Sequence, residues 1–201
     1  MITRLSAFIT PHSPPEKRQR YCEGGIEFKL SEAAVQLAFS LYLLEHENGG
    51  GTVEMFPDGE HAKRFDIPSF LTSLGFSKTA SMGSTAYGGT YQRDDQTLIV
   101  NPKSQHGRGD VVGVLDEVVV RAECKGGIIN SKHSGARSSL RSGFNELIGQ
   151  TMSMAVDGAR HIAVAPQTSD SELQASRLKD RCKSAGIEIA LITRDGEVIF
   201  A

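Results

Sequence analysis

Apolar positions recur at two spacings along the first half of the chain, and each spacing predicts a different element. After Ser31, a residue that can cap a helix, apolar side chains follow at helical spacing until the glycine run after Asn48. Short apolar runs and Gly or Pro boundaries mark the elements that follow. The first half therefore predicts a helix from Ser31, a strand over 52–56, a helix over 68–74 that Gly75 ends, and a loop over 77–89.

The second half carries stronger strand patterns, rich in Val, Ile and Leu. The predicted strands cover 90–92, 97–100, 110–115, 118–125, 161–165, 187–193 and 197–200. Apolar residues from Leu140 to Ala155 mark an amphipathic helix, and a second helix is predicted over 171–185. The last strand, helix and strand form a β-α-β unit, so we expect these two strands to pair in parallel.

Composition is that of a globular protein outside the membrane, with 39% hydrophobic and 23% charged residues. No apolar run approaches the roughly 18 residues of a membrane span, and residues 1–15 show no secretory signal. A cytoplasmic protein without membrane contact is therefore expected. The net charge of −2 argues against bulk attraction to nucleic acid, so such binding would depend on local basic clusters. The three cysteines form no C-x-x-C pair and are expected to be reduced.

Three segments are expected within one compact domain of 201 residues. Residues 1–29 form an N-terminal arm, in which the proline-rich and basic stretch 10–20 is predicted to lack a fixed fold of its own. Residues 30–89 form an α/β extension packed on the core, and residues 90–201 form the core itself.

A predicted hairpin brings two acids and a lysine together. If Asp116 and Glu117 form a two-residue turn, counting outward places Asp110 directly opposite Glu123. Directly opposed residues have Cβ atoms roughly 4.5–5.5 Å apart, and Lys125 points to the same face as Glu123. The three side chains should therefore converge.

Apolar residues on both faces of this hairpin predict that both faces are buried, with the acids at an edge or cleft of the sheet. An ordinary exposed ion pair, worth at most about 1 kcal/mol, is the alternative. Two carboxylates held so close repel each other and lose hydration, and a divalent cation removes that cost. The hairpin therefore predicts a magnesium site.

The sequence Gly109-Asp110, followed by Glu123-Cys124-Lys125, resembles the signature of the PD-(D/E)xK, or restriction-endonuclease-like, nucleases. Arg108-Gly109 stands where many members carry a proline. The resemblance covers about residues 90–200. It implies an α/β fold with a mixed central β-sheet flanked by helices, here with an extra N-terminal helical and strand segment.

The same resemblance implies a chemistry and roles for the signature residues. Asp110 and Glu123 would bind Mg²⁺, with Mn²⁺ able to substitute, helped by the backbone carbonyl of Cys124. Lys125 would orient or activate the attacking water. The implied reaction is hydrolysis of DNA phosphodiester bonds with the metal as Lewis acid.

Two further family features have candidates in this chain. Many members carry a glutamine on the helix after the signature, and Gln150 fits that place, although it is equally read as a surface residue. A glutamate on the first helix is also common, and Glu32 is the candidate ligand, with Glu45 and Glu60 as rivals. Acids favour helix N-termini through the helix dipole alone, which is the structural alternative for Glu32.

The stretch after the signature, up to Arg141, is basic and holds no acid. Such clusters bind phosphate backbones, and the alternative is a solvated loop. The candidate DNA contacts are Lys132, His133, Arg137 and Arg141.

The sequence leaves two other functions open. One is a nucleic-acid-binding module of the same fold that is catalytically silent or depends on a partner. The other is an RNA nuclease. The intact set of Asp110, Glu123 and Lys125 favours a metal-dependent deoxyribonuclease of the restriction, repair or recombination type, and a homodimer that cuts both strands stays open.

Overall fold

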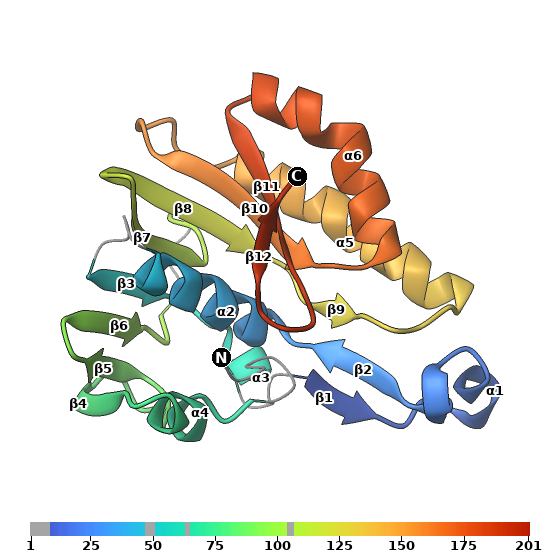
Figure 1. The fold of residues 1–201 in the computed structure, drawn as a ribbon, viewed down its shortest axis with the longest axis horizontal. Helices are drawn as coiled ribbons and strands as arrows, with labels where there is room; N and C mark the ends of the chain where they lie inside the picture. The colour runs from blue at the N-terminus through green and yellow to red at the C-terminus, as the bar shows by residue number, and fades with distance from the viewer. Residues whose placement is uncertain (1–8, 47–50, 63–64, 104–106) are drawn as a thin grey trace.

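The computed structural model describes residues 9–46, 51–62, 65–103 and 107–201 of the chain (Figure 1). The strands are β1 (Ile9–His12), β2 (Glu27–Leu30), β3 (Thr52–Met55), β4 (Ser77–Ser81), β5 (Gly89–Arg93), β6 (Gln96–Val100), β7 (Val111–Leu115), β8 (Val118–Cys124), β9 (Gly127–Ile128), β10 (Arg160–Pro166), β11 (Ile187–Ile192) and β12 (Val198–Phe200). The helices are α1 (Glu16–Gln19), α2 (Glu32–Glu45), α3 (Gly59–Ala62), α4 (Ile67–Ser73), α5 (Ser134–Met152) and α6 (Ser169–Ser184), with a 3₁₀ turn η2 (Glu23–Gly25).

Within the described residues, a main sheet of nine strands has the order β12-β11-β10-β8-β7-β3-β6-β5-β4. A smaller sheet of three strands, β1-β2-β9, lies beside it (Figure 1). In the main sheet β8 with β10, β10 with β11, and β3 with β6 pair in parallel, and the other neighbours pair antiparallel. The chain is therefore a mixed α/β protein with a large, mostly antiparallel central sheet flanked by helices.

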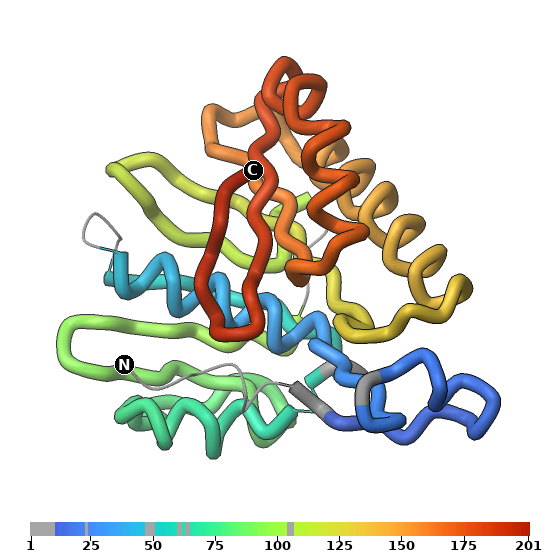
Figure 2. The backbone as a smooth tube through the Cα atoms, turned by 45° about the vertical axis from the view of Figure 1, so that its right-hand side comes forward, coloured from blue at the N-terminus to red at the C-terminus, as the bar shows by residue number. Residues whose placement is uncertain are grey.

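Helices cover both faces of the main sheet around β10. Ile162 and Val164 of β10 belong to the larger core cluster, in which α2 supplies most of the helical side chains. Ala163 and Ala165 point the other way, into a second cluster with Phe144 of α5 and residues of α6. Figures 1 and 2 show α5 and α6 packed side by side, away from α2. Because both faces of β10 are covered, the strand is continuously apolar from Ile162 onward.

Several predicted elements are confirmed. Ser31 caps α2, because its Oγ accepts a hydrogen bond of 3.2 Å from the backbone N–H of Ala34. The β10-α6-β11 unit pairs in parallel as expected. Leu115 pairs with Val118, so the predicted two-residue hairpin turn is also present. The glycine run predicted to end the first helix lies largely outside the described residues.

Two segments differ from the prediction. The predicted loop 77–89 begins with a strand, β4, which pairs with β5 at the edge of the main sheet. All five β4 residues are exposed, so the strand has no apolar alternation that the sequence could show. In the N-terminal arm, β1 pairs with β2, and β2 pairs with β9 from the second half of the chain. That pairing orders the arm, and its residues 1–8 lie outside the described part.

Residues 30–89 share the core with the rest of the chain. β3 is hydrogen-bonded between β7 and β6, and α2 supplies many of the buried residues of the larger cluster. The segment expected to be an extension on the core therefore contributes an interior strand and a central helix.

The expectation that both hairpin faces are buried is wrong for the face that carries the acids. Val119 is 43% exposed, and Val112 and Val114 are half-buried. The strand residues beneath α5 and α6 come from β10 and β11, so these helices leave the turn end of the hairpin uncovered. Burial of this face is therefore concentrated at the opposite end, where Asp110 and Glu123 lie.

We expect Glu117→Gly to raise the free energy of unfolding by about 1 kcal/mol, because the left-handed backbone strains a residue with a Cβ. Asp116 and Glu117 have φ of 51° and 63°, and Glu117 is exposed. Urea unfolding measures the change. Lys179→Gly, at an exposed position inside α6, should instead lose about 1 kcal/mol. Destabilisation by both variants would contradict the strain at Glu117.

Candidate active site

The backbone of Asp110 is fixed between two strands. Its N–H donates to the carbonyl of Ala122 on β8 at 2.7 Å, and its carbonyl accepts from Phe56 N–H, just after β3, at 2.8 Å. The paired residues of β7 and β8 end with Val111 opposite Ala122, and Asp110, one residue earlier, also bonds to Ala122, as at a β-bulge. Asp110 therefore lies beside the end of β8 that carries Glu123, but not in the regular pair with Glu123 that the sequence predicts. The side chain is held as well, because Oδ2 accepts from Cys124 N–H at 2.8 Å.

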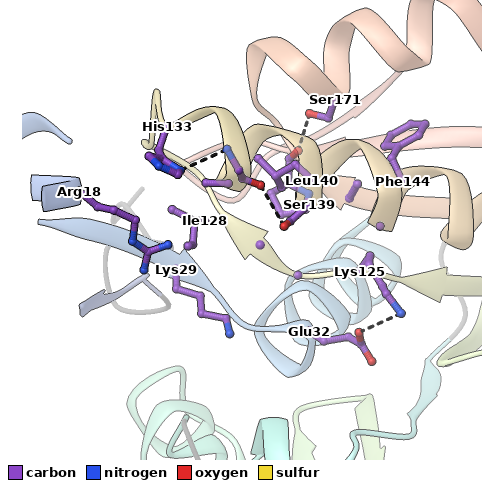
Figure 3. A pocket seen from close by; sticks show the side chains of 17 residues that line it. Arg18, Lys29, Glu32, Lys125, Ile128, His133, Ser139, Leu140, Phe144 and Ser171 are labelled. Atoms are coloured by element: carbon purple, nitrogen blue, oxygen red, sulfur yellow. Dashed lines mark hydrogen bonds and ion pairs between the residues drawn. The ribbon is translucent and has the colours of Figure 1, made fainter. Parts of the chain in front are cut away.

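Gly126 allows the start of α2 to lie against the end of β8. A Cβ at Gly126 would lie 2.5 Å from the carbonyl oxygen of Leu30 and 2.6 Å from the backbone nitrogen of Glu32. Only glycine permits such an approach. As a result, Glu32 at the first turn of α2 lies beside Lys125, with 3.9 Å between Oε2 and Nζ (Figure 3).

Asp110 and Glu123 form a hydrogen-bonded carboxyl pair. Burial and the charge of Asp110 raise the pKa of Glu123 to about 8. Burial also raises the pKa of Asp110, against the hydrogen bond from Cys124 N–H, which lowers it. At neutral pH the pair therefore holds a proton.

Glu32 belongs to the same cluster of carboxyls. Burial and the charge of Asp110 raise the pKa of Glu32 to about 7, with Asp58 adding in the same direction. Of its rivals, Glu45 lies at the other end of α2 and pairs with Arg93 at 2.9 Å. The side chain of Glu60 lies outside the described residues. The first-helix glutamate that the structure brings to the cluster is thus Glu32.

Lys125 lies between acids from two helices. Its Nζ donates to Oε1 of Glu146, on α5, at 3.1 Å and faces Glu32 on the other side. Burial lowers the pKa of Lys125, but the hydrogen bond to Glu146 and the charges of Glu32 and Asp110 outweigh this, so the net shift is upward. Lys125 is therefore a cation at neutral pH.

Two residues of the cluster were missed by the sequence reasoning. Gln36 is 1% exposed and hydrogen-bonds Asp110, while its Oε1 has no hydrogen-bond partner among the described residues. Gln36 follows Glu32 by four residues, so helical spacing puts both side chains on one face of α2. That spacing could have identified Gln36 as a residue of the site. Glu146 gave no such signal, because its contact with Lys125 depends on how α5 packs against β8.

The raised carboxyl pKa values make the metal-free protein less stable as pH rises. The folded state keeps protons that the unfolded chain loses above its ordinary carboxyl pKa of 4.5, up to the folded pKa of about 8 of Glu123. We expect the free energy of unfolding in EDTA to fall between pH 5 and pH 8. The fall should be roughly 1–2 kcal/mol, discounted because water reaches these half-buried groups.

Urea unfolding at a series of pH values measures this slope. Glu123→Gln removes the main titrating group and should flatten the dependence. An equally steep fall in that variant would assign the pH dependence to other groups.

The donors that could hold a divalent cation are the carboxylates of Asp110 and Glu123 and the carbonyl of Cys124. All are oxygens, the atoms that Mg²⁺ prefers. Among the described residues, no group of three or more His, Cys, Asp or Glu side chains is arranged to hold a metal ion by itself. The donor set at Asp110 and Glu123 differs from such a group because it combines two carboxylates with a backbone oxygen.

Three further candidate residues lie elsewhere on α5, Gln150 beyond Glu146 and Arg137 and Arg141 before it. Gln150 is exposed, one turn beyond Glu146 on the same helical face. Arg137 donates two hydrogen bonds, of 2.6 and 3.0 Å, to the buried carboxylate of Asp170 on α6, and Arg141 adds one of 3.2 Å. The hydrogen bond with Arg137 lowers the pKa of Asp170. Both arginines therefore join α5 to α6, and each remains partly exposed.

Lys132 and His133 lie at the start of α5. The Nδ1 of His133 accepts from Gly135 N–H at 3.2 Å and so caps the helix. Lys132 lines a hollow of about 800 Å³ that other basic side chains share, namely Arg20, Arg137 and Arg194. Basic side chains thus gather around this hollow, which Asp170 also lines, and their contact with DNA remains a prediction.

Comparison with known proteins yields no relative: no family model, curated protein or solved structure matches the chain. In the described part of the chain, no helix has the length and apolar character needed to cross a membrane.

Proposed function

We propose that this protein is a magnesium-dependent nuclease that hydrolyses phosphodiester bonds of DNA. The observation that supports it most is the convergence of a half-buried, interacting carboxyl pair, Asp110 and Glu123, with the charged Lys125. All three lie at the end of one strand pair, between α2 and α5.

The donor set fits a divalent cation. Asp110 and Glu123 reduce their mutual repulsion by keeping a proton between them. The positive charge of a bound cation would offset the same repulsion with both carboxylates ionised. The acceptor Oε1 of Gln36 is buried beside them with no partner among the described residues. Magnesium at this site would polarise the scissile phosphate and lower the pKa of an attacking water.

Lys125 acts as a cation in this proposal. Because its pKa is raised, it keeps its proton at neutral pH and cannot serve as the general base. Its ammonium group can instead orient the attacking water by hydrogen bonding and stabilise the negative charge that grows on the phosphate. Glu32 and Glu146 hold the Lys125 ammonium from two sides and so position it.

Basic side chains next to the centre support a polyanionic substrate. Beyond Lys125 lie Arg18 and Lys29 in one hollow, and Lys132 with Arg137 in the next. The two hollows share Ile128 and Leu140, so the basic surface continues from one to the other. Phosphate backbones bind to such surfaces.

The direct test is incubation of the purified protein with linear duplex, circular and single-stranded DNA, and with RNA, in the presence of Mg²⁺ or Mn²⁺. We expect cutting with either metal and none in EDTA. Cutting of RNA but not of DNA would show that the protein is an RNA nuclease. Binding without cutting on every substrate would favour the nucleic-acid-binding module.

A further inference from the structure

A pocket of about 590 Å³ opens beside Lys125 and Glu32. It extends between β2, β9 and the first half of α5 to Arg18 and His133 (Figure 3). Lys125 and Glu32 lie at one end, and Arg18 and His133 at the other, with Ile128 and Leu140 between them. The pocket is thus continuous with the candidate active site.

Its charged groups suit an anion. Arg18, Lys29 and Lys125 line it, and Glu32 is the one carboxylate among the described lining residues. Arg18 is anchored by the buried carboxylate of Glu27, 3.8 Å from its Nη2, and keeps 30% of its side chain exposed. The pairing of Lys29 with Ile128 fixes the N-terminal segment along the pocket wall.

Its walls, however, are mainly apolar. Ile128, Leu140 and Phe144 line the middle, and four glycines of the lining leave room between them. A groove that binds only the phosphates of a duplex needs no apolar recess of this volume. A recess of several hundred Å³ with apolar walls and a few polar groups is typical of a site for a small organic group.

We propose that the pocket holds one unpaired nucleotide of the substrate strand. Its base would lie against Ile128 and Leu140, and its phosphates would face Arg18 and Lys29. This inference rests on the proposed nuclease function. It specifies the substrate as DNA with an unpaired end or single strand next to the scissile bond, because a base inside a duplex is not free to enter.

The test measures DNA binding by the full-length protein in EDTA, where no cutting occurs. Fluorescence anisotropy compares a blunt duplex, a duplex with a single-stranded tail, and the same tail without bases. We expect the tailed duplex to bind about tenfold tighter than the blunt one, and the abasic tail to lose most of that gain. Equal affinity for normal and abasic tails would show that only phosphates are bound and would overturn the proposal.

Two neighbouring serines of α5 give a matched pair of variants. Ser139 is exposed and lines the pocket, whereas Ser138 lies outside its lining. Ser139→Glu should remove the preference for the tail, and Ser138→Glu, with the same charge change, should keep it. If both variants keep the preference for the tailed duplex, the tail does not bind in this pocket and the proposal is wrong. These binding measurements need no cleavage. A failure of the pocket proposal can therefore be distinguished from a failure of the proposed nuclease function.

Discussion

Glu123→Gln should reduce magnesium-dependent cleavage by at least about 10³-fold, because losing a metal ligand costs several kcal/mol of transition-state stabilisation. The substitution keeps the shape of the side chain. Its amide can still donate a hydrogen bond to Asp110, so the contact between the two side chains can be kept. The fold should therefore be retained, and at pH 8 the metal-free variant should be at least as stable as the wild type.

Initial cleavage rates and urea unfolding, measured on the same preparations, separate activity from stability. Glu172→Gln, which removes an exposed carboxylate on α6, is the matched control and should cut at the wild-type rate. Full activity in the folded Glu123→Gln protein would remove Glu123 from the catalytic centre.

Lys125→Met should lower the cleavage rate at saturating DNA by about 10²–10³-fold, the usual cost of losing a group that stabilises transition-state charge. Methionine retains most of the apolar stem and removes the ammonium group. Glu32, Asp110 and Glu123 then lose the positive charge that lowers their pKa values, so these three pKa values should rise. DNA affinity in EDTA should change far less than the rate.

Single-turnover cleavage and anisotropy binding measure the two quantities. Lys183→Met, at an exposed position in the last turn of α6, controls for loss of one positive charge. A Lys125→Met protein that cuts normally but binds DNA weakly would make Lys125 a binding residue instead.

The hairpin was predictable because its information is local. The Asp116-Glu117 turn fixes the register, and the register brings the start of β7, next to Asp110, to the end of β8 that carries Glu123. The cap of α2 is local too, since Ser31 and Ala34 are three residues apart. These features carry the core of the candidate site.

The rest of the site depends on packing between distant segments. Glu146 reaches Lys125 only because α5 crosses the end of β8, and Arg137 meets Asp170 across two helices. Likewise, β9 orders the N-terminal arm and brings Arg18 and Lys29 to the pocket. No periodicity in the sequence encodes such contacts.

The most direct test of the central claim is the cleavage rate of linear DNA against Mg²⁺ concentration, for the wild type and for Asp110→Asn. A shared metal centre at Asp110, Glu123 and Lys125 predicts a saturable rise in the wild type, abolished by EDTA and absent from a folded Asp110→Asn protein. Cleavage by Asp110→Asn with the same metal dependence as the wild type would contradict the account.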